Sequence, residues 1–296
     1  MSNRPLIGVI CYMPDTVQNL EARMKAHATQ LEWLKSWMKL EDVLHRVESA
    51  WTPSYDYSMI NPEGINIDHI QVPAAYPGGN RNVLLDLLYK SDADWLICMD
   101  DDRMMYPHYA PESFFDDLQS PTGIEFAKNG VMIKILLPIM QPFRKTNSAY
   151  PFKKESWWIE KVTPNGNLQI CCIPNLVKYG RKPIYFNAET ACQLGDPPED
   201  LSFELDWVIA RNGLARNNML IMKEIGGGEN SSLYADKNHR HEVEQAHKPW
   251  LTQYLKSKFP RNPALWNKTE LSKRRNSYTE QKFPRSTPWD DAWDAK

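Results

Sequence analysis

The segment that most constrains the fold is WLICMDDD at residues 95–102. Its first five residues carry no charge, and its last three are Asp100, Asp101 and Asp102. A short apolar run of this kind is typical of a strand buried on both faces near the middle of a sheet. Adjacent carboxylates at the end of such a strand repel one another, and a divalent cation with phosphate oxygens relieves that repulsion. The segment therefore predicts a site for Mg²⁺ or Mn²⁺ and a phosphorylated ligand. The alternative is a solvated acidic turn.

Helical and extended patterns alternate along the first 225 residues. Strands are predicted at 5–11, 45–52, 95–99, 131–140 and 217–225, and helices at 18–44, 82–90, 111–119 and 201–214, with a further helix from Asn187 to Gly195. Residues 53–75 are predicted to be largely a polar loop and 141–180 to be irregular. The alternation predicts an α/β fold with a mostly parallel central sheet flanked by helices, in which ligands bind beyond the carboxyl ends of the strands. His27, Trp33 and Trp37 are interpreted as core residues of the first helix.

The chain of 296 residues is long enough for one large α/β domain with an appendage. We expect that domain at 1–247, with a nucleotide-sugar half at 1–106 and an acceptor half at 107–247. From residue 248 the composition becomes basic and then acidic and aromatic, which predicts a C-terminal extension over 248–296. The formal net charge is −2, so the overall composition is not that of a polyanion-binding protein, although a local basic patch remains compatible with it.

Cysteine usage favours a reducing compartment. The chain has five cysteines, an odd number, and no two of them form a CxxC pair. This argues against a zinc ribbon and against a disulfide framework. The first residues lack the shape of a signal peptide, and no apolar run is long enough to span a bilayer. We therefore expect a cytoplasmic protein, in the host cytoplasm if its origin is a phage.

The segment YPGGNRNVLLDLLYKSDADWLICMDDDRMMYP, at residues 76–107, resembles the nucleotide-sugar half of GT-A-fold glycosyltransferases, family 2 in particular. Those enzymes carry a Gly/Ala-Arg-Asn turn, a helix, and a strand that ends in a DxD motif. The resemblance implies transfer of a sugar from a nucleotide-diphosphate sugar, most simply a UDP-sugar, to an acceptor hydroxyl with inversion. The metal would stabilise negative charge on the leaving diphosphate.

The resemblance also implies roles for individual residues. Asp102 would bind the metal, Asp100 would contact the ribose or reach the metal through water, and Asp101 would be the variable middle position. Residues expected around the nucleotide are Tyr12, Pro14, Asn80, Arg81 and Asn82.

The acidic segment PEDLSFELDWVIARNG provides candidates for the general base that deprotonates the acceptor. We expect this base to be Glu204 or Asp206, with Arg211 on the acceptor side. The alternative is an ordinary acidic first turn of a helix. By the resemblance, His239 or His241 would be a third metal ligand, although an isolated histidine is more often structural. The glycine run 226–228 is either a hinge over the donor or a plain loop.

The aromatic and basic stretch 142–161 is expected to lie on the acceptor side, with Trp157 and Trp158 able to stack on a sugar or a base. An acceptor with hydroxymethylated DNA bases, as in some phage enzymes, fits this pattern. A saccharide, a lipid-linked sugar or a protein fits it equally well. Three other functions stay open: a nucleotidyltransferase, a non-catalytic nucleic-acid-binding protein, and a metal nuclease. The first is disfavoured because CYMPDTVQN lacks the glycine-rich phosphate loop of that class.

Overall fold

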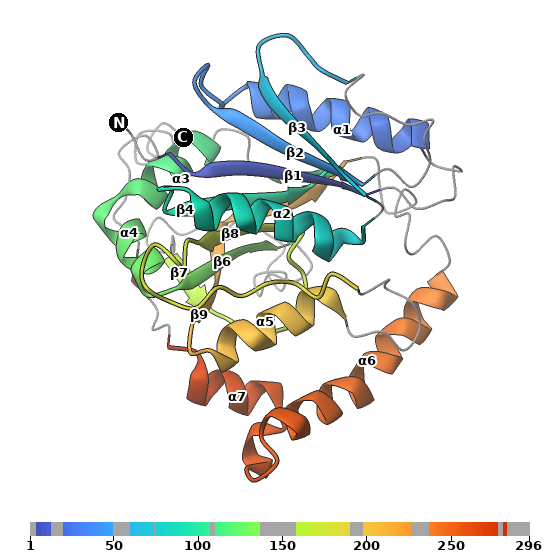
Figure 1. Ribbon diagram of the computed structural model, residues 1–296, viewed down its shortest axis with the longest axis vertical. Helices are drawn as coiled ribbons and strands as arrows, with labels where there is room; N and C mark the ends of the chain where they lie inside the picture. Colours follow the sequence, from blue (N-terminus) through green and yellow to red (C-terminus); the bar gives the residue numbers. More distant parts are fainter. Residues whose placement is uncertain are drawn as a thin grey trace, which may run out of the picture.

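The computed structural model describes residues 4–12, 20–49, 60–73, 75–106, 110–136, 158–189, 198–225, 237–277 and 281–282. Within these residues one sheet has the strand order β10-β7-β9-β6-β8-β4-β1-β2-β3, with β5 paired to β9 (Figure 1). The strands are β1 (Leu6–Tyr12), β2 (Val43–Ser49), β3 (Asn66–Val72), β4 (Trp95–Asp100), β5 (Arg103–Tyr106), β6 (Val131–Leu136), β7 (Trp158–Lys161), β8 (Ile170–Pro174), β9 (Gly213–Glu224) and β10 (Gln281–Lys282).

Helices cover both faces of the sheet. They are α1 (Leu20–Lys35), α2 (Pro77–Lys90), α3 (Ala110–Gln119), α4 (Pro121–Lys128), α5 (Glu199–Ile209), α6 (Lys237–Lys258), the 3₁₀ turn η6 (Pro263–Leu265) and α7 (Lys268–Arg275). The predicted α/β architecture with a central sheet flanked by helices is confirmed.

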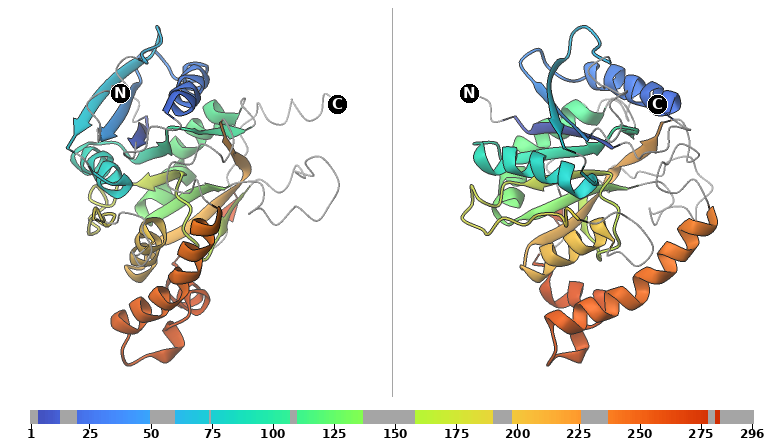
Figure 2. Two further views of the ribbon diagram at one scale, coloured as in Figure 1. Left: turned by 90° about the vertical axis from the view of Figure 1, so that its right-hand side faces the viewer. Right: turned by 45° about the vertical axis from the view of Figure 1, so that its right-hand side comes forward.

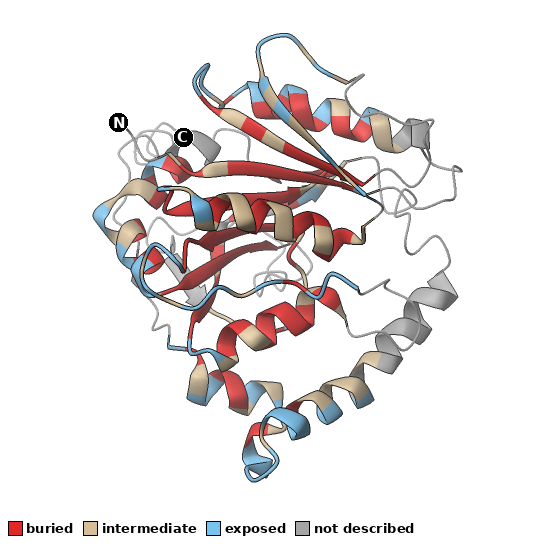
Figure 3. Ribbon diagram, viewed as in Figure 1, coloured by how far each residue is buried: buried red, intermediate tan, exposed pale blue. Residues whose placement is uncertain are grey.

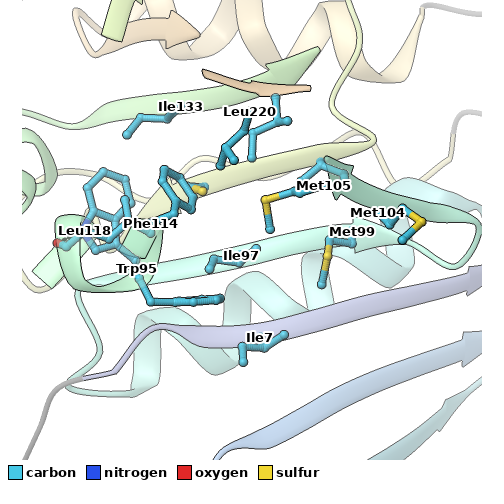
Figure 4. Close-up of a cluster of buried hydrophobic side chains, with 14 of the residues drawn as sticks. Ile7, Trp95, Ile97, Met99, Met104, Met105, Phe114, Leu118, Ile133 and Leu220 are labelled. Carbon is cyan, nitrogen blue, oxygen red and sulfur yellow. Dashed lines mark hydrogen bonds between the residues drawn. The ribbon is translucent and has the colours of Figure 1, made fainter. Parts of the chain in front are cut away.

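Strand alternation creates two hydrophobic cores because successive side chains point to opposite faces. Trp95, Ile97 and Met99 of β4 pack on the face covered by α1, α3 and α4. Leu96 and Cys98 pack on the opposite face, which is covered by α2 and α5. Figure 4 shows the first of these cores, where β4 lies beside residues of α3. Figure 3 shows that β4 and its neighbours β1, β8 and β6 are buried throughout most of their length.

The direction of the strands is mostly parallel, as predicted. β1, β2, β3 and β4 run the same way, and β6, β9 and β10 share that direction. β8 runs antiparallel between β4 and β6, and β5 and β7 are antiparallel to β9. Because β8 joins β4 to β6, it links the first half of the sheet to the second.

The first helix is shorter than predicted, since α1 ends at Lys35 and β2 begins at Val43. The carboxylate of Asp42 accepts a hydrogen bond from the backbone N–H of Lys39 at 2.8 Å. It also accepts hydrogen bonds from Nε and Nη2 of Arg4 at 2.6 and 2.7 Å. These contacts stabilise a turn where a helix was expected. Leu40, which would lie in that continued helix, is 87% exposed.

The core assignments of His27, Trp33 and Trp37 are correct, although Trp37 follows the end of α1. His27 is fully buried against Gln30, and Trp37 stacks on Phe115 with ring centroids 4.5 Å apart. Trp33 meets Trp37 edge to face at 5.3 Å.

Several elements were not predicted. β3 lies where a polar loop was expected. It is an edge strand and is partly exposed, so its sequence NIDHIQV has few apolar residues and did not indicate a strand. β7 and β8 lie in the stretch expected to be irregular. α6 runs unbroken across the boundary expected between residues 247 and 248. Most of the helix expected from Asn187 to Gly195 and the end of the strand expected at 131–140 fall outside the described residues.

None of the helices in the described segments combines the length and the apolar composition that crossing a bilayer requires.

Asp117 of α3 is a buried acid whose charge the fold does not compensate. It is 4% exposed, and no described residue donates a hydrogen bond to its Oδ2. Burial, with a smaller contribution from Asp116, raises the pKa of Asp117 to about 8. The side chain is therefore protonated in the folded protein at neutral pH.

We predict that Asp117→Asn stabilises the protein relative to wild type, increasingly so as pH rises. A raised folded-state pKa contributes stability that is complete below the unfolded pKa near 4 and is lost as pH rises through about 8. The expected gain at pH 8 is about 1–3 kcal/mol in unfolding free energy, measured by urea denaturation from pH 5 to 9. Asp116→Asn, at the exposed neighbour, should have a much smaller effect. A pH-independent difference for Asp117→Asn would contradict the assignment.

Candidate functional site

Arg81 of α2 joins three carboxylates at the carboxyl end of β4. Its Nη2 lies 2.8 Å from Oδ1 of Asp100, the last residue of that strand. Its Nη1 lies 2.5 Å from Oε1 of Glu199 and 3.1 Å from Oδ1 of Asp200, both in the first turn of α5. The guanidinium of Arg81 thus connects the central strand to α5, a helix that begins 118 residues after Arg81 in the chain.

Two helix N-termini meet at this place. α2 begins at Pro77 and α5 follows Pro198, and proline suits a position where a helix starts because it has no N–H to leave unpaired. Glu199 and Asp200 lie where the α5 dipole stabilises negative charge. Gly78 permits the close approach, since a Cβ there would lie 2.6 Å from the carbonyl oxygen of Asn187 and 3.2 Å from Cδ of Glu199.

The site holds more acid than base. Burial raises the pKa of Asp100 to about 6, against the opposing effect of Arg81. Burial likewise raises the pKa of Glu199 to about 7, again opposed by Arg81. A single guanidinium therefore leaves these carboxylates incompletely compensated, and such a site favours a further cation.

The other two aspartates of the triplet have cationic partners of their own. Asp101 is fully buried and pairs with Arg23 of α1, whose Nη2 lies 2.5 Å from Oδ1. Asp102 lies 3.3 Å from Nη1 of Arg103, and burial raises the pKa of Asp102 against the effect of Arg103. Gln30 donates to the carbonyl oxygens of Asp100 and Arg103 at 2.7 and 2.5 Å, which fixes the turn between them.

The donor chemistry at this turn fits a hard divalent cation. Asp100 and Asp102 lie close enough for the charge of Asp102 to raise the pKa of Asp100. No group of three His, Cys, Asp or Glu suited to a metal occurs in the described ranges. Mg²⁺ commonly takes only one or two carboxylates and completes its shell with phosphate oxygens and water, so two carboxylates suffice.

The two asparagines beside Arg81 support the backbone. The fully buried Asn80 donates to Ser49 Oγ at 2.8 Å and to the carbonyl of Cys11 at 3.3 Å, which ties α2 to the ends of β1 and β2. Asn82 exchanges two hydrogen bonds with the backbone of Phe186, at 2.8 and 3.0 Å. Tyr12 is the last residue of β1, opposite Ser49 of β2.

Neither expected base contacts Arg81 or Asp100. Glu204 is fully buried, forms an ion pair with Lys134 of β6, and accepts the backbone N–H groups of Asn165 and Gly166 at 2.7 and 3.0 Å. The side chain of Asp206 is 39% exposed, and it accepts a hydrogen bond from Tyr254 of α6.

The remaining expected site residues belong to other elements or lie outside the described residues. Arg211 is exposed just after the far end of α5, and the helix from Asp200 to Ile209 alone spans about 14 Å at 1.5 Å per residue. Trp158 begins β7, and His239 and His241 are in the first turns of α6. Three further sets fall outside the described residues: Pro14, Trp157 and the glycines 226–228.

Sequence analysis passed over Glu199 and Asp200, which the structure places at Arg81. The available signal was the Pro-Pro-Glu-Asp sequence, in which prolines precede an adjacent acidic pair at a helix start. That pair lies in the same acidic segment as Glu204 and Asp206, a few residues before them.

Sequence comparisons give no relatives, since no protein-family model and no curated protein matches the chain. Solved structures with a similar fold include residues 1–349 of TarS from S. aureus, at a TM-score of 0.48 and 14% identity, covering 88% of this chain and 74% of that chain. The same fragment in complex with UDP-GlcNAc has a TM-score of 0.47 at 14% identity, with 88% and 75% covered. A197 from STIV has a TM-score of 0.38 at 12% identity, with 75% and 85% covered.

We predict that Gly78→Ala destabilises the protein by about 1–3 kcal/mol, although alanine is the better helix former by about 1 kcal/mol. The added methyl group would meet the carbonyl oxygen of Asn187 and push α2 away from Glu199. Gly79→Ala is the matched control in the same turn, because its Cβ would first meet the methyl group of Ala75 at 3.0 Å. Thermal unfolding of both variants checks this. Equal melting temperatures for the two would refute the close approach at Gly78.

Proposed function

We propose that the chain is a glycosyltransferase that moves a sugar from a nucleotide-diphosphate sugar, a UDP-sugar in the first instance, to an acceptor hydroxyl. The observation that carries this proposal is the contact of Arg81 with both Asp100 and the acidic first turn of α5. It brings a strand-end carboxylate suited to a metal and diphosphate next to a second carboxylate suited to proton transfer. A sugar transfer that releases a diphosphate needs both groups near one another.

On the donor side, Asp100 and Asp102 would hold Mn²⁺ or Mg²⁺. When bound, that ion supplies positive charge for the diphosphate that leaves. Arg81 acts before any ligand binds, because it fixes the orientation of Asp100 and keeps part of its charge compensated. The ends of β1 and β2, which Asn80 ties to α2, would border the nucleotide together with Tyr12 and Pro14.

On the acceptor side, Asp200 is our candidate for the general base. Its side chain is 24% exposed, and its Oδ1 touches the guanidinium that also holds Asp100. Its Oδ2 accepts the backbone N–H of Leu168 at 2.8 Å, so the carboxylate is held in a fixed orientation. The resemblance places the base at the start of a helix, where Asp200 lies.

Glu204 and Asp206 receive different roles under this proposal. Glu204 has no exposed surface and an ammonium partner in Lys134, so we assign it to holding the fold together. Asp206 keeps solvent access and remains the second candidate for the base, although its contacts are with α6.

The test combines ligand-induced stabilisation with turnover. We expect UDP with Mn²⁺ to raise the melting temperature of the wild-type protein, because a ligand that binds the native state at 100 times its Kd stabilises it by about 2.7 kcal/mol. Asp100→Asn should lose the metal-dependent part of that shift. Asp200→Asn should keep it, while release of UDP from a UDP-sugar falls by about 100-fold or more.

The outcomes separate the two assignments. No stabilisation by any nucleoside diphosphate, with or without metal, would contradict the proposed function. Undiminished turnover in Asp200→Asn together with lost turnover in Asp206→Asn would transfer the role of base to Asp206.

A further inference from the structure

The C-terminal helices form a basic projection that the proposed site does not use. We call residues 249–277 the basic arm: it comprises the second half of α6, η6 and α7. The arm has one acidic residue, Glu270, and seven basic ones, which are Lys256, Lys258, Arg261, Lys268, Lys273, Arg274 and Arg275. Its formal charge is thus +6, whereas the whole chain has −2, so the remaining residues carry −8.

Most of this positive charge faces solvent. Lys256, Lys258, Arg261, Lys273 and Arg274 are all exposed. Glu270 pairs with Lys273 at 2.8 Å and lies 3.9 Å from Arg274. Lys256 and Arg261 make no ion pair with any residue in the described part of the chain. Lys258 lies 3.5 Å from Oδ1 of Asp206 in α5. Even with these pairs, the exposed cations of the arm outnumber their acidic partners, so the arm keeps a net positive charge.

The arm is fixed to the body of the protein. Leu255, Leu265 and Leu271 are buried in the core that α5 shares. Asn276 exchanges hydrogen bonds with the backbone of Leu214 in β9, at 2.9 and 3.1 Å. Tyr254 donates to Asp206 on the outer face of α5, the helix whose first turn supplies Glu199 and Asp200. The position of the charge relative to the site is thereby set.

The arm lies on the outer side of α5, which separates it from β4 (Figure 1). Figure 1 shows α6 running from the side of the molecule where β1 and β4 end towards the bottom of the view, and Figure 2 shows α6 and α7 projecting from the body. The arm packs against α5, whose 11 residues span about 16 Å. About five base pairs of duplex DNA, at 3.4 Å each, span the same length.

We propose that the basic arm docks duplex DNA and that the acceptor of the proposed sugar transfer is a hydroxyl group on that DNA; this rests on the proposed function. A rigidly held arm suits a stiff partner, and the persistence length of duplex DNA is about 150 base pairs. The carboxylates of the site repel any phosphate that no metal bridges, so a polyanionic acceptor needs attraction from elsewhere on the protein. Lys256 over the ring of Trp266 and Arg275 over the ring of Phe259, each at 5.0 Å, show that these cations lie along aromatic surface in defined positions.

The test uses the full chain and a fluorescent duplex of about 20 base pairs, which at 3.4 Å per base pair is longer than α5. The arm variant replaces Lys256, Arg261, Lys273 and Arg274 by Gln. The control variant replaces four exposed lysines on other elements by Gln: Lys35, Lys39, Lys90 and Lys128. Both sets are on the surface, so we expect both variants to fold, with circular dichroism and melting temperature as the check.

We expect the arm variant to bind DNA about tenfold or more weakly than wild type, with the slope of log K against log salt reduced by up to about 3.6 for four lost phosphate contacts. The control variant should keep the wild-type affinity and slope. Equal weakening of both variants, or none in the arm variant, would overturn the proposal.

A competition experiment decides the class of polyanion. If heparin displaces the labelled duplex as effectively as unlabelled duplex does, the arm binds any polyanion by charge, and the proposal that its partner is DNA is wrong. Stabilisation by UDP with Mn²⁺, measured on the same arm variant, separates the two proposals. Failure of the wild-type protein to bind DNA, with UDP binding retained, would overturn only the docking of DNA.

Discussion

The structure of the site depends on the guanidinium of Arg81. Three carboxylates approach it from two elements, the end of β4 and the start of α5. Without that cation, these acids would be adjacent, shielded from most of the solvent and of like charge, an arrangement whose cost is several kcal/mol. With it, burial still holds the pKa values of Asp100 and Glu199 above their usual range. The fold thus keeps the three carboxylates together around one cation.

The rest of the fold brings these two elements to one edge of the sheet. β8 joins the parallel first half to the second half, and beside it the backbone N–H of Asp100 bonds to the carbonyl of Gln169 at 2.9 Å. The loop before β8 is held from α5 by two acids four residues apart, which share a helix face. Asp200 accepts from Leu168 and Glu204 accepts from Asn165 and Gly166. The buried pair of Glu204 with Lys134 therefore positions the helix that presents Asp200.

Sequence reasoning found the central strand and one side of the site. The apolar run before Asp100 and the glycine-rich helix start before Arg81 are local patterns, and the structure brings those two residues into contact. The partners Glu199 and Asp200 lie 118 and 119 residues after Arg81, and only tertiary packing selects them over Glu204 and Asp206. The partner of Asp101 is likewise set by tertiary packing, because Arg23 lies on α1, far from Asp101 in the sequence. β3 was missed because an edge strand needs no continuous apolar pattern.

The most direct measurement of the central claim is the stability of Arg81→Met as a function of pH. If Arg81 compensates three carboxylates, its loss should lower the unfolding free energy by about 3–5 kcal/mol at pH 8. The deficit should shrink as pH falls towards 5, because the acids then bind protons in the folded state and no longer repel one another. A deficit that is the same at pH 5 and pH 8, or no deficit at all, would show that these carboxylates do not depend on Arg81.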